Sequence, residues 1–351
     1  MELFDTLAEM GHEEILVASD PSSGYRGIIA VHSTALGPAL GGTRFWQYDS
    51  DEAAIIDALR LSRGMTYKNA VAGLDLGGGK AVIIGDNRTT DREGIFRAHG
   101  RFVESLGGRY ITAEDVGTGT ADMDFVNIET EHVAGLKHKS GDPSPVTAHG
   151  VFRAIEASAK NRWGSDDLTG RVVAIQGCGN VGRNLANELH EAGAKLTVSD
   201  IDPARAERVA RETGATIVSG DDIYAVEADI FAPCALGGII NDETLPVFSF
   251  EIISGGANNQ LLEERHGDKL EEMGMQYAPD YVANAGGVIN VFGEVAGWDS
   301  ERALRKADDI YDTVLQVFEI AKADGVPSYV AADRLAERRL AQVKTKWKPP
   351  R

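Results

Sequence analysis

The sequence predicts an α/β protein of two domains, the second of which has a Rossmann-type, doubly wound fold. Three observations lead to this prediction. The chain has 351 residues. This length favours two hydrophobic cores, because a single core stops growing at about 250–300 residues. Short apolar runs with strand character alternate with helical segments along most of the chain. A glycine fingerprint, residues 177–182, directly follows one of the predicted strands.

Composition and charge narrow the class of protein. Lys and Arg number 35 and Asp and Glu 54, so the formal net charge is −19, which argues against a nucleic-acid-binding surface. The two cysteines, Cys178 and Cys234, lie in no C-x-x-C or Cys/His cluster, so we expect neither a disulfide framework nor a bound metal. No apolar run is long enough to span a bilayer, and the first residues do not resemble a secretory signal. We therefore expect a cytoplasmic protein without a membrane or nucleic-acid partner.

The first part of the chain is predicted to be one α/β unit. Asp49 and Glu52 resemble a capping box that opens a helix ending near Arg63, and a second helix is expected at about 92–105. The expected strands are 15–18, 27–32, 81–84 and 109–113. The last of these strands runs out into Glu114 and Asp115, and open α/β sheets place their ligands at the carboxyl ends of strands.

A glycine-rich stretch, residues 73–80, carries a candidate catalytic lysine. We interpret it as a loop whose glycines let the backbone approach a ligand closely, because no Cβ stands in the way. Lys80 ends this stretch and can be held out of bulk water, which lowers the pKa of its amine and makes it a usable base. Lys68, on a different element, would stay charged and bind a carboxylate. A Walker-type phosphate loop is excluded, because Leu74 and Ala81 occupy the positions that require Gly and Ser or Thr.

Turn-forming residues at 140–145 mark the predicted domain boundary, where Ser144 and Pro145 can start a helix that runs to about Lys160. A fully apolar strand core at 171–176 then leads into the fingerprint. Further strands are expected at 196–199 and within 228–236, 251–259 and 275–280. Further helices are expected at 181–192, 203–213, from the glycine turn at 284–287, and at about 301–323 and 331–346. This continued alternation favours a parallel sheet in the second domain.

The fingerprint Gly177-Cys-Gly-Asn-Val-Gly182 has the context that a dinucleotide site requires, a strand before it and a helix after it. Gly177 would make the tight turn, Gly179 would let the pyrophosphate approach, and Gly182 would allow close packing of the helix on the strand. The pyrophosphate would lie at the helix N-terminus. The next strand ends in Asp200, which can accept hydrogen bonds from a ribose and would repel a 2′-phosphate, so NAD is expected rather than NADP. Arg205 is the alternative partner for such a phosphate.

Several motifs together resemble the glutamate/leucine/phenylalanine/valine dehydrogenase family, over essentially the whole chain. They are Leu40-Gly-Gly-Thr-Arg44, Arg63-Gly-Met-Thr-Tyr-Lys68-Asn69, Gly77-Gly-Gly-Lys80, Ile111-Thr-Ala-Glu-Asp115-Val-Gly-Thr118, Gly255-Gly-Ala-Asn-Asn-Gln260 and Asn284-Ala-Gly-Gly-Val-Ile-Asn290. The resemblance implies reversible oxidative deamination of an L-amino acid to its 2-oxo acid and ammonium, with NAD accepting the hydride. It also implies a homo-oligomer, from dimer to octamer.

The family's site residues can be assigned to matching positions. By resemblance, Lys80 activates water or the carbonyl oxygen, Asp115 transfers protons to and from the amino group, and Lys68 binds the substrate carboxylate. The substrate site would also include Gly41, Gly42 and Met65, with Leu40, Ala113, Val288 and Val291 around the substrate side chain. The coenzyme site would comprise Thr147, Gly177, Cys178, Gly179, Asn180, Val181, Gly182, Asp200, Cys234, Ala235, Leu236, Ala257, Asn259 and Asn284.

The resemblance also implies a domain arrangement and a substrate class. A substrate-binding and oligomerisation domain is expected at 1–145, with a C-terminal helix at about 325–351 packing back on it, and the NAD-binding domain at 146–324, with the active-site cleft between them. The aliphatic set around the side chain indicates L-leucine and other branched-chain amino acids. A phenylalanine or valine dehydrogenase of the same family remains an alternative, as does a non-catalytic NAD-sensing protein, since fold does not determine function.

Overall fold

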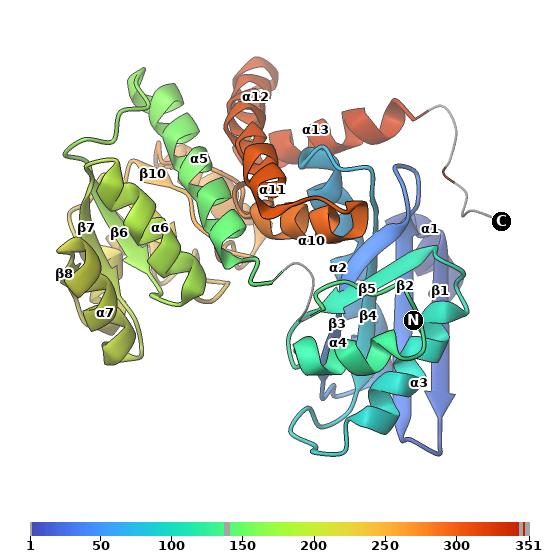
Figure 1. Cartoon of the computed structure of the whole chain (residues 1–351). Coiled ribbons are helices and arrows are strands. Elements are labelled where there is room, and N and C mark those ends of the chain that lie inside the picture. Colours follow the sequence, from blue (N-terminus) through green and yellow to red (C-terminus); the bar gives the residue numbers. More distant parts are fainter. Residues whose placement is uncertain (1, 137–140, 344–346, 348–351) are drawn as a thin grey trace. The chain divides into compact units, whose positions relative to one another are not determined.

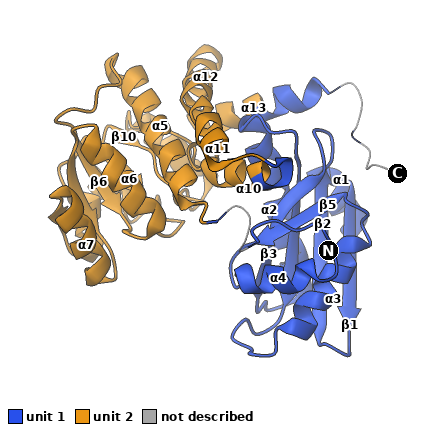
Figure 2. Ribbon diagram, in the orientation of Figure 1, with its two compact units in different colours: residues 1–141, 294–297, 336–351 blue, residues 142–293, 298–335 orange. Residues whose placement is uncertain are grey.

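The computed structural model describes residues 2–136, 141–343 and 347, and it confirms the predicted two-domain α/β class (Figure 1). The chain divides into two compact units (Figure 2). Unit 1 comprises residues 1–141, 294–297 and 336–351, and unit 2 comprises residues 142–293 and 298–335. Within the described ranges, no helix combines the length and the apolar character that a membrane span requires.

Unit 1 contains a five-stranded mixed sheet with the strand order β1-β2-β4-β3-β5. β1 and β4 pair antiparallel with β2, whereas β3 pairs parallel with both β4 and β5. The strands are β1 (Glu14–Asp20), β2 (Tyr25–Ser33), β3 (Ala39–Trp46), β4 (Gly77–Ile84) and β5 (Tyr110–Glu114). All four predicted strands of this unit are confirmed. β3 has no strand pattern in the sequence, because Gly41 and Gly42 interrupt it.

Helices cover both faces of this sheet. The helices of unit 1 that lie wholly within it are α1 (Leu3–Met10), α2 (Asp51–Val71), α3 (Glu93–Glu104) and α4 (Thr120–Asn127). α1 and α2 cover one face, hereafter the α2 face, where Ala58 and Leu59 pack with Val82 of β4. α3 and α4 cover the opposite face, hereafter the α3 face, through a cluster that includes Phe96 and Met123.

The glycines at 77–79 do not form the predicted loop; they belong to β4. A Cβ on Gly78 would lie 2.1 Å from the backbone nitrogen of Thr66 in α2, and one on Gly79 would lie 2.6 Å from the ring of Tyr110. Glycine is therefore needed here because a helix and an aromatic ring lie directly on the strand, not because the backbone turns. Lys80 consequently lies within the strand rather than at its start.

The helix predicted at 49–63 is longer than expected. Ser50, and not Asp49, caps α2 by accepting a hydrogen bond from the backbone nitrogen of Ala53, and the helix continues to Val71. Gly64 lowers the local helix propensity, but the last two turns of α2 bury several side chains against the sheet, and such tertiary packing outweighs propensity. Lys68 is therefore a helical residue.

Unit 2 contains a six-stranded sheet with the order β11-β10-β9-β6-β7-β8, in which every pair is parallel. The strands are β6 (Val172–Gln176), β7 (Lys195–Ser199), β8 (Thr216–Ile217), β9 (Ile230–Pro233), β10 (Ile252–Ile253) and β11 (Gln276–Tyr277). This is the doubly wound order of Rossmann-type domains. The order reverses between β6 and β9, and ligands bind at the carboxyl ends of the strands that flank such a point.

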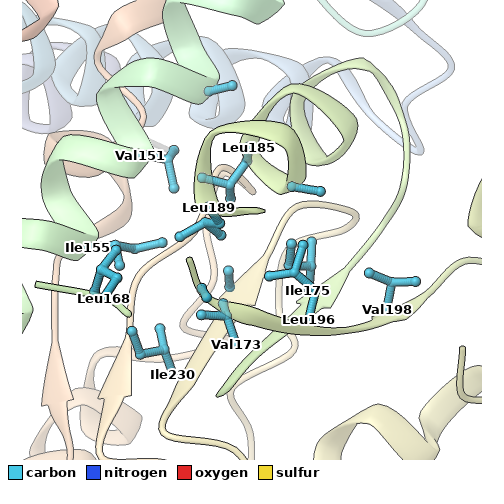
Figure 3. Close-up of a cluster of buried hydrophobic side chains, with 14 of the residues drawn as sticks. Val151, Ile155, Leu168, Val173, Ile175, Leu185, Leu189, Leu196, Val198 and Ile230 are labelled. Carbon is cyan, nitrogen blue, oxygen red and sulfur yellow. The ribbon is translucent and has the colours of Figure 1, made fainter. Parts of the chain in front are cut away.

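The remaining helices belong wholly or partly to unit 2. They are α5 (Ser144–Trp163), α6 (Asn180–Glu191), α7 (Pro203–Thr213), α8 (Glu264–Glu272), α9 (Asp280–Ala283), α10 (Gly286–Ala296), α11 (Ser300–Ala307), α12 (Asp309–Asp324) and α13 (Ser328–Ala341), with short 3₁₀ turns η1 (Gly220–Ala225) and η2 (Leu245–Val247). Figure 3 shows the core between α5, α6 and the sheet, in which Val151 and Leu185 lie near Val173 and Ile175. The other face of the sheet is covered by an aromatic cluster that includes Phe231 and Phe250.

Two helix predictions need correction. The helix expected at 301–323 is divided at Asp308 into α11 and α12. Asp308 accepts a hydrogen bond from His149 Nε2 at 3.0 Å, so the division lies where this part of the chain is attached to α5. The helix expected at 331–346 begins earlier, at Ser328, and ends at Ala341, whereas residues 344–346 lie outside the described residues.

Candidate active site

The structure brings the two predicted catalytic side chains together in unit 1. Lys80 Nζ lies 2.9 Å from Asp115 Oδ2, and the two side chains are 6% and 23% exposed. Lys80 stands in β4 and Asp115 immediately follows β5, so the pair joins parts of two parallel strands that flank β3. Burial lowers the pKa of an ammonium group, so a buried lysine beside a carboxylate can exchange a proton with a bound ligand. A solvated surface lysine keeps its ordinary pKa and stays charged.

Burial and charge act on this pair in opposite directions. Burial lowers the pKa of Lys80, and this effect outweighs the opposing attraction of Asp115. Burial opposes ionisation of Asp115, but the cations Lys80 and Arg44 outweigh it, so the pKa of Asp115 lies below its usual range. The arrangement therefore keeps Asp115 ionised and brings Lys80 closer to the neutral form that a base requires.

Asp115 is held by two residues, Arg44 and Thr118, for which the sequence predicts no role. Arg44 Nε donates to Asp115 Oδ2 at 3.0 Å. The Asp115 backbone nitrogen donates to Thr118 Oγ1 at 2.9 Å, and that hydroxyl lies 3.0 Å from the carbonyl of Thr43. Arg44 and Thr118 occur in the quoted motifs, but only the fold shows that both contact Asp115.

The strand register places four predicted site residues on one face of the sheet. In β3, Leu40 pairs with Gly78 of β4, and Gly42 pairs with Ala113 of β5. Side chains alternate along a strand with a period of two, so Leu40, Gly42, Ala113 and Lys80 all project towards the α2 face. Leu40 and Ala113 are buried, at 2% and 8% exposure. A small apolar surface therefore lies on the same face as Lys80, the candidate catalytic lysine.

Lys68 and Met65 lie on α2, the helix that covers this face. They are three residues apart and therefore on one side of the helix, and both are half-buried. Gly41 and Gly42 allow close approach of neighbouring strands, since a Cβ on them would lie 1.7 Å from Gly79 O and 2.3 Å from Glu114 O respectively. The carbonyl of Gly41 accepts a hydrogen bond from the Tyr110 hydroxyl at 2.6 Å.

Unit 2 carries the fingerprint at the carboxyl end of β6. Gly177 has a φ of 98°, in the left-handed region that favours glycine. A Cβ on Gly182 would lie 1.9 Å from the carbonyl oxygen of Gly177, whereas one on Gly179 would meet no atom within 4 Å. Gly182 thus permits the packing of α6 on the turn, and Gly179 leaves open space above the helix N-terminus, where Asn180 and Val181 begin α6.

Asp200 follows β7 and turns its carboxylate towards the fingerprint. Its Oδ2 accepts from the backbone nitrogen of Cys178 at 2.6 Å, and its Oδ1 accepts from the backbone nitrogen of Asp202 at 2.8 Å. These bonds fix the carboxylate beside the glycine turn, at the place from which a ribose would be recognised.

A cavity of about 710 Å³ opens at the same place. It is lined by Ser144, Gly179, Asn180, Val181, Asp202, Ala204, Arg205, Arg208, Arg211 and Cys234. Among the residues that the structure describes, Arg208 Nε is buried and has no hydrogen-bond acceptor. The open helix N-terminus and this donor both suit phosphate groups, so the residues present fit a dinucleotide. Of these three arginines, only Arg205 is predicted from the sequence; Arg208 and Arg211 are identified by the structure.

The other predicted coenzyme residues also lie around the carboxyl ends of the strands in unit 2. Cys234 and Ala235 follow β9, and a Cβ on Gly177 would lie 2.9 Å from the Ala235 Cβ. Asn284 is buried, and its side-chain nitrogen donates to Asn258 Oδ1 at 2.8 Å and lies 3.4 Å from the carbonyl of Ala257. Three predicted coenzyme residues remain. Thr147 lies on the first turn of α5, Leu236 lies on an exposed loop, and Asn259 has a φ of 52°.

Val288 and Val291 belong to unit 2, where they lie three residues apart on α10. Val288 is 6% exposed and Val291 is partly buried. This spacing places both on one side of the helix. Of the residues predicted to surround the substrate side chain, two therefore belong to each unit.

Comparison with known proteins gives concordant matches along the chain. A family profile described as "Glu/Leu/Phe/Val dehydrogenase, dimerisation domain" matches residues 12–132, and one described as "Glutamate/Leucine/Phenylalanine/Valine dehydrogenase" matches residues 140–207 and 197–346. The chain is 56% identical to the leucine dehydrogenase of Geobacillus stearothermophilus over 352 residues, which cover 99% of this chain and 96% of that protein. It is 51% identical to the L-tryptophan dehydrogenase of Nostoc punctiforme, with 98% of each chain covered.

Among solved structures, the crystal structure of L-tryptophan dehydrogenase from Nostoc punctiforme is similar to this one, with a TM-score of 0.89 and 50% sequence identity. The similarity covers 97% of this chain and 99% of that one. Sequence and structure comparisons therefore agree over both units.

Proposed function

Because this chain belongs to the Glu/Leu/Phe/Val dehydrogenase family and is an amino-acid dehydrogenase, we propose that it catalyses the reversible, NAD-dependent oxidative deamination of L-leucine and other branched-chain L-amino acids. The products are the 2-oxo acid, ammonium and reduced coenzyme. The observation that carries this proposal is the buried pair of Lys80 and Asp115, with a separation of 2.9 Å.

The pair matches the proton transfers that deamination needs. After the substrate has become an iminium, a water molecule must lose a proton as it attacks the carbon, and Lys80 in its neutral form accepts that proton. Burial favours this neutral form, because it lowers the pKa of Lys80. Asp115 stays ionised between Lys80 and Arg44; it stabilises the positive charge of the iminium and carries protons to and from the departing amine.

Substrate binding is assigned to residues around this pair. Lys68 neutralises the substrate carboxylate from α2, with Met65 one turn before it and with backbone groups of Gly41 and Gly42 beside it. A fixed carboxylate and a fixed amino group leave the substrate side chain directed towards the apolar part of the α2 face. Positioning of this kind contributes strongly to catalysis, because it removes the entropic cost of bringing the reacting groups together.

The choice of a branched-chain substrate rests on the aliphatic character of Leu40, Ala113, Val288 and Val291. No lysine or serine is present at these positions to bind the carboxylate of a glutamate substrate. The 56% identity to a leucine dehydrogenase supports the same choice. The 51% identity to an L-tryptophan dehydrogenase makes an aromatic substrate the second candidate, and phenylalanine and valine dehydrogenases of the family remain alternatives.

The coenzyme is a pyridine nucleotide, and we assign it as NAD. When bound, its nicotinamide accepts the hydride from the substrate. The pyrophosphate is assigned to the N-terminus of α6, with Gly179, Asn180 and Val181, and the adenosine ribose to Asp200. The nicotinamide half is assigned to Thr147, Ala257, Asn259 and Asn284, with Cys234, Ala235 and Leu236 on the loop after β9.

The assignment of an oligomeric state follows from the matched domains. The profile that matches residues 12–132 is described as a dimerisation domain, and we propose that the protein is a homo-oligomer. Light scattering of the purified protein would test this, and a monomer at micromolar concentration would contradict it.

One screen tests the proposed reaction. The purified protein is mixed with NAD or NADP and with single L-amino acids (Leu, Ile, Val, Phe, Trp or Glu), and formation of the reduced nicotinamide is followed by absorbance. We expect reduction of NAD with the branched-chain substrates fastest, and no reduction by a Lys80→Ala variant. Binding of NADH without reduction of NAD by any amino acid would contradict the proposal and support a non-catalytic NAD-sensing protein.

A further inference from the structure

Arg44 lies between two carboxylates that are partly removed from water. It stands in β3, where its Nε donates to Asp115 Oδ2 at 3.0 Å and its Nη1 donates to Asp57 Oδ2 at 2.8 Å. The side chains of Arg44 and Asp57 are 20% and 15% exposed. Asp57 lies on α2. Arg44 thus joins the catalytic carboxylate to a second carboxylate on a different element.

Asp57 is itself held by two further groups. The hydroxyl of Tyr48 donates to its Oδ2 at 2.7 Å, and Arg60 Nη2 donates to its Oδ1 at 3.0 Å. Arg60 is largely exposed, whereas Arg44 is not. The buried part of the network, formed by Lys80, Asp115, Arg44 and Asp57, has two positive and two negative charges, so its net charge is balanced.

We infer that Arg44 is a positioning residue for the proposed reaction, which orients the carboxylate of Asp115 and sets the charge balance of the Lys80–Asp115 pair. This inference rests on the proposed function, because it concerns the same catalytic pair. It assigns to Arg44 no contact with the substrate, and it makes Asp57 the group that holds Arg44 in place.

The geometry supports an orienting role. Arg44 and Lys80 both bind the same atom of Asp115, Oδ2. Two donors on one oxygen fix the orientation of the carboxylate. The planar guanidinium reaches two carboxylates with separate nitrogens, which the single ammonium of a lysine does less well.

The charges of Arg44 and Asp57 predict the direction in which each substitution should change the pKa values of the pair. Positive charge on Arg44 lowers the pKa of Lys80 and that of Asp115, whereas negative charge on Asp57 raises the pKa of Lys80. Tyr48, from the loop after β3, contacts Asp57 rather than the pair, and Tyr110 of β5 packs on the opposite, α3 face of the sheet. Burial raises the pKa values of both tyrosines and keeps them neutral. α2 also carries Lys68. Loss of the charge on Arg44 should therefore raise both pKa values of the pair, and loss of the charge on Asp57 should lower that of Lys80.

The test is the pH dependence of kcat for deamination of L-leucine. We use kcat because it reports the groups of the enzyme–substrate complex and not the free amino acid. The variants are Arg44→Gln, Arg44→Lys and Asp57→Asn, the last of which keeps an acceptor oxygen for Arg44 and Tyr48. Arg60→Gln is the matched control, because it removes the other positive charge that contacts Asp57, on the solvent-exposed side of that carboxylate.

The acidic limb of the profile is the pH range in which kcat rises as Lys80 loses its proton. We expect Arg44→Gln to shift this limb upward by about one pH unit, in line with the effect of a charge at this distance. The same variant should lower kcat at neutral pH by at least tenfold. Asp57→Asn should shift the limb downward. Arg44→Lys should keep the limb near its wild-type position, because the lysine retains the positive charge. It should still reduce kcat, because a single ammonium does not bind Asp115 and Asp57 together as the guanidinium does. Arg60→Gln should leave the limb in place. All variants should bind NADH as the wild type does.

A merely structural role for Arg44 would lower kcat equally at every pH, and that result for Arg44→Gln would overturn the inference. A shift in the same direction for Arg44→Gln and Asp57→Asn, or an equal shift for Arg60→Gln, would also overturn it. If Arg44→Gln does not fold, Arg44→Lys decides the matter, because a kcat equal to that of the wild type would overturn the inference. An inactive wild type would instead contradict the proposed function, so the two failures are distinguishable.

Discussion

Lys80 Nζ and Asp115 Oδ2 are 2.9 Å apart, and the lysine is the more deeply buried of the two. Burial disfavours its charged form, whereas Asp115 favours it, and the two effects leave the pKa of Lys80 below its ordinary value. Groups this close titrate as a coupled pair. The relationship supports the proposed role of Lys80 as proton acceptor, with Asp115 as the adjacent negative charge.

Replacement of the two lysines should separate catalysis from binding. Lys80→Met should lower kcat by about 10²–10⁴-fold, the usual contribution of a general base. Lys68→Met should mainly raise the KM for the amino acid, by about 10–100-fold, because a charged hydrogen bond to the substrate is worth about 1.5–3 kcal/mol. Steady-state kinetics with L-leucine and NAD measures both values. Near-normal turnover of Lys80→Met would refute the role of Lys80 as a base, and both variants should still bind NADH.

The coenzyme preference should depend on Asp200. The wild type should use NAD at least tenfold better than NADP in kcat/KM, because a 2′-phosphate would meet the carboxylate of Asp200. Asp200→Asn keeps an acceptor for the backbone nitrogen of Cys178 but removes the repulsion, and three arginines line the same cavity. This variant should therefore gain efficiency with NADP. Adding Arg205→Gln should reverse part of the gain, and equal use of both coenzymes by the wild type would contradict the assignment.

His149 should make the stability of unit 2 depend on pH. Its Nδ1 lies 2.8 Å from Glu188 Oε2 and its Nε2 lies 3.0 Å from Asp308 Oδ1. The hydrogen bond to Glu188 outweighs burial and, with Asp308, raises the pKa of His149 above its ordinary value of 6.5. Arg153 also faces Asp308, at 3.4 Å. The stabilisation is therefore fully present below about pH 6.5 and is lost as the pH rises through the raised pKa.

Thermal unfolding of His149→Gln tests this dependence. The variant should lose about 2–4 °C in Tm at pH 6, which corresponds to roughly 1 kcal/mol, and much less at pH 9. His190→Gln is a matched control, because His190 lies exposed near the end of α6. An equal loss for His149→Gln at both pH values would show that its packing, and not its charge, stabilises the fold.

The sequence predicts the parts of the fold that are encoded locally. The G-x-G-x-x-G fingerprint, the apolar strand before it and the Asp202–Pro203 helix start depend on neighbouring residues, and the structure contains all three. Gly78 and Gly79 are different, because their need for glycine comes from Thr66 and Tyr110, which pack on them from other elements. Their sequence resembles a loop, and only tertiary packing shows that they form a strand.

The same distinction applies to the candidate site. Lys80 and Asp115 can be found from motifs of a recognised family, and the structure confirms that the two side chains are in contact. The contacts of Arg44 with Asp115 and Asp57 depend on the register of β3 between β4 and β5 and on the length of α2. Neither could be derived from the sequence, because β3 lacks an alternating pattern and Gly64 suggests an early end of the helix.

Two glycine substitutions should have opposite effects on stability. A Cβ on Gly78 would lie 2.1 Å from the Thr66 backbone nitrogen, whereas one on Gly64 would meet no atom within 4 Å. Gly78→Ala should therefore lower the free energy of unfolding by about 1–3 kcal/mol or more, since the helix must move. Gly64→Ala should raise it by about 0.5–1 kcal/mol, as expected within an exposed helix. Denaturant unfolding measures both, and a neutral Gly78→Ala would contradict the close packing of α2 on β4.

The final prediction concerns the size of the substrate pocket. Ala113 is buried and shares a face of the sheet with Leu40 and Lys80. Ala113→Gly removes one methyl group from this face, so a larger side chain gains room while leucine loses contacts. The ratio of kcat/KM for L-phenylalanine to that for L-leucine should rise by an amount equivalent to about 1–3 kcal/mol, the usual effect of a methyl-scale change in an apolar pocket. The wild type should prefer leucine or valine.

A control separates this effect from a general loosening of the strands. Ala81 follows Lys80 in β4, is fully buried and packs on the α3 face of the sheet. Ala81→Gly should lower stability, because it too removes a buried methyl group, but it should leave the substrate ratio unchanged. A ratio that rises equally in both variants would mean that flexibility, and not pocket volume, admits the larger substrate. A wild type already faster on phenylalanine, or an unchanged ratio in Ala113→Gly, would show that other residues set the pocket, and the assignment of a branched-chain substrate would then be wrong.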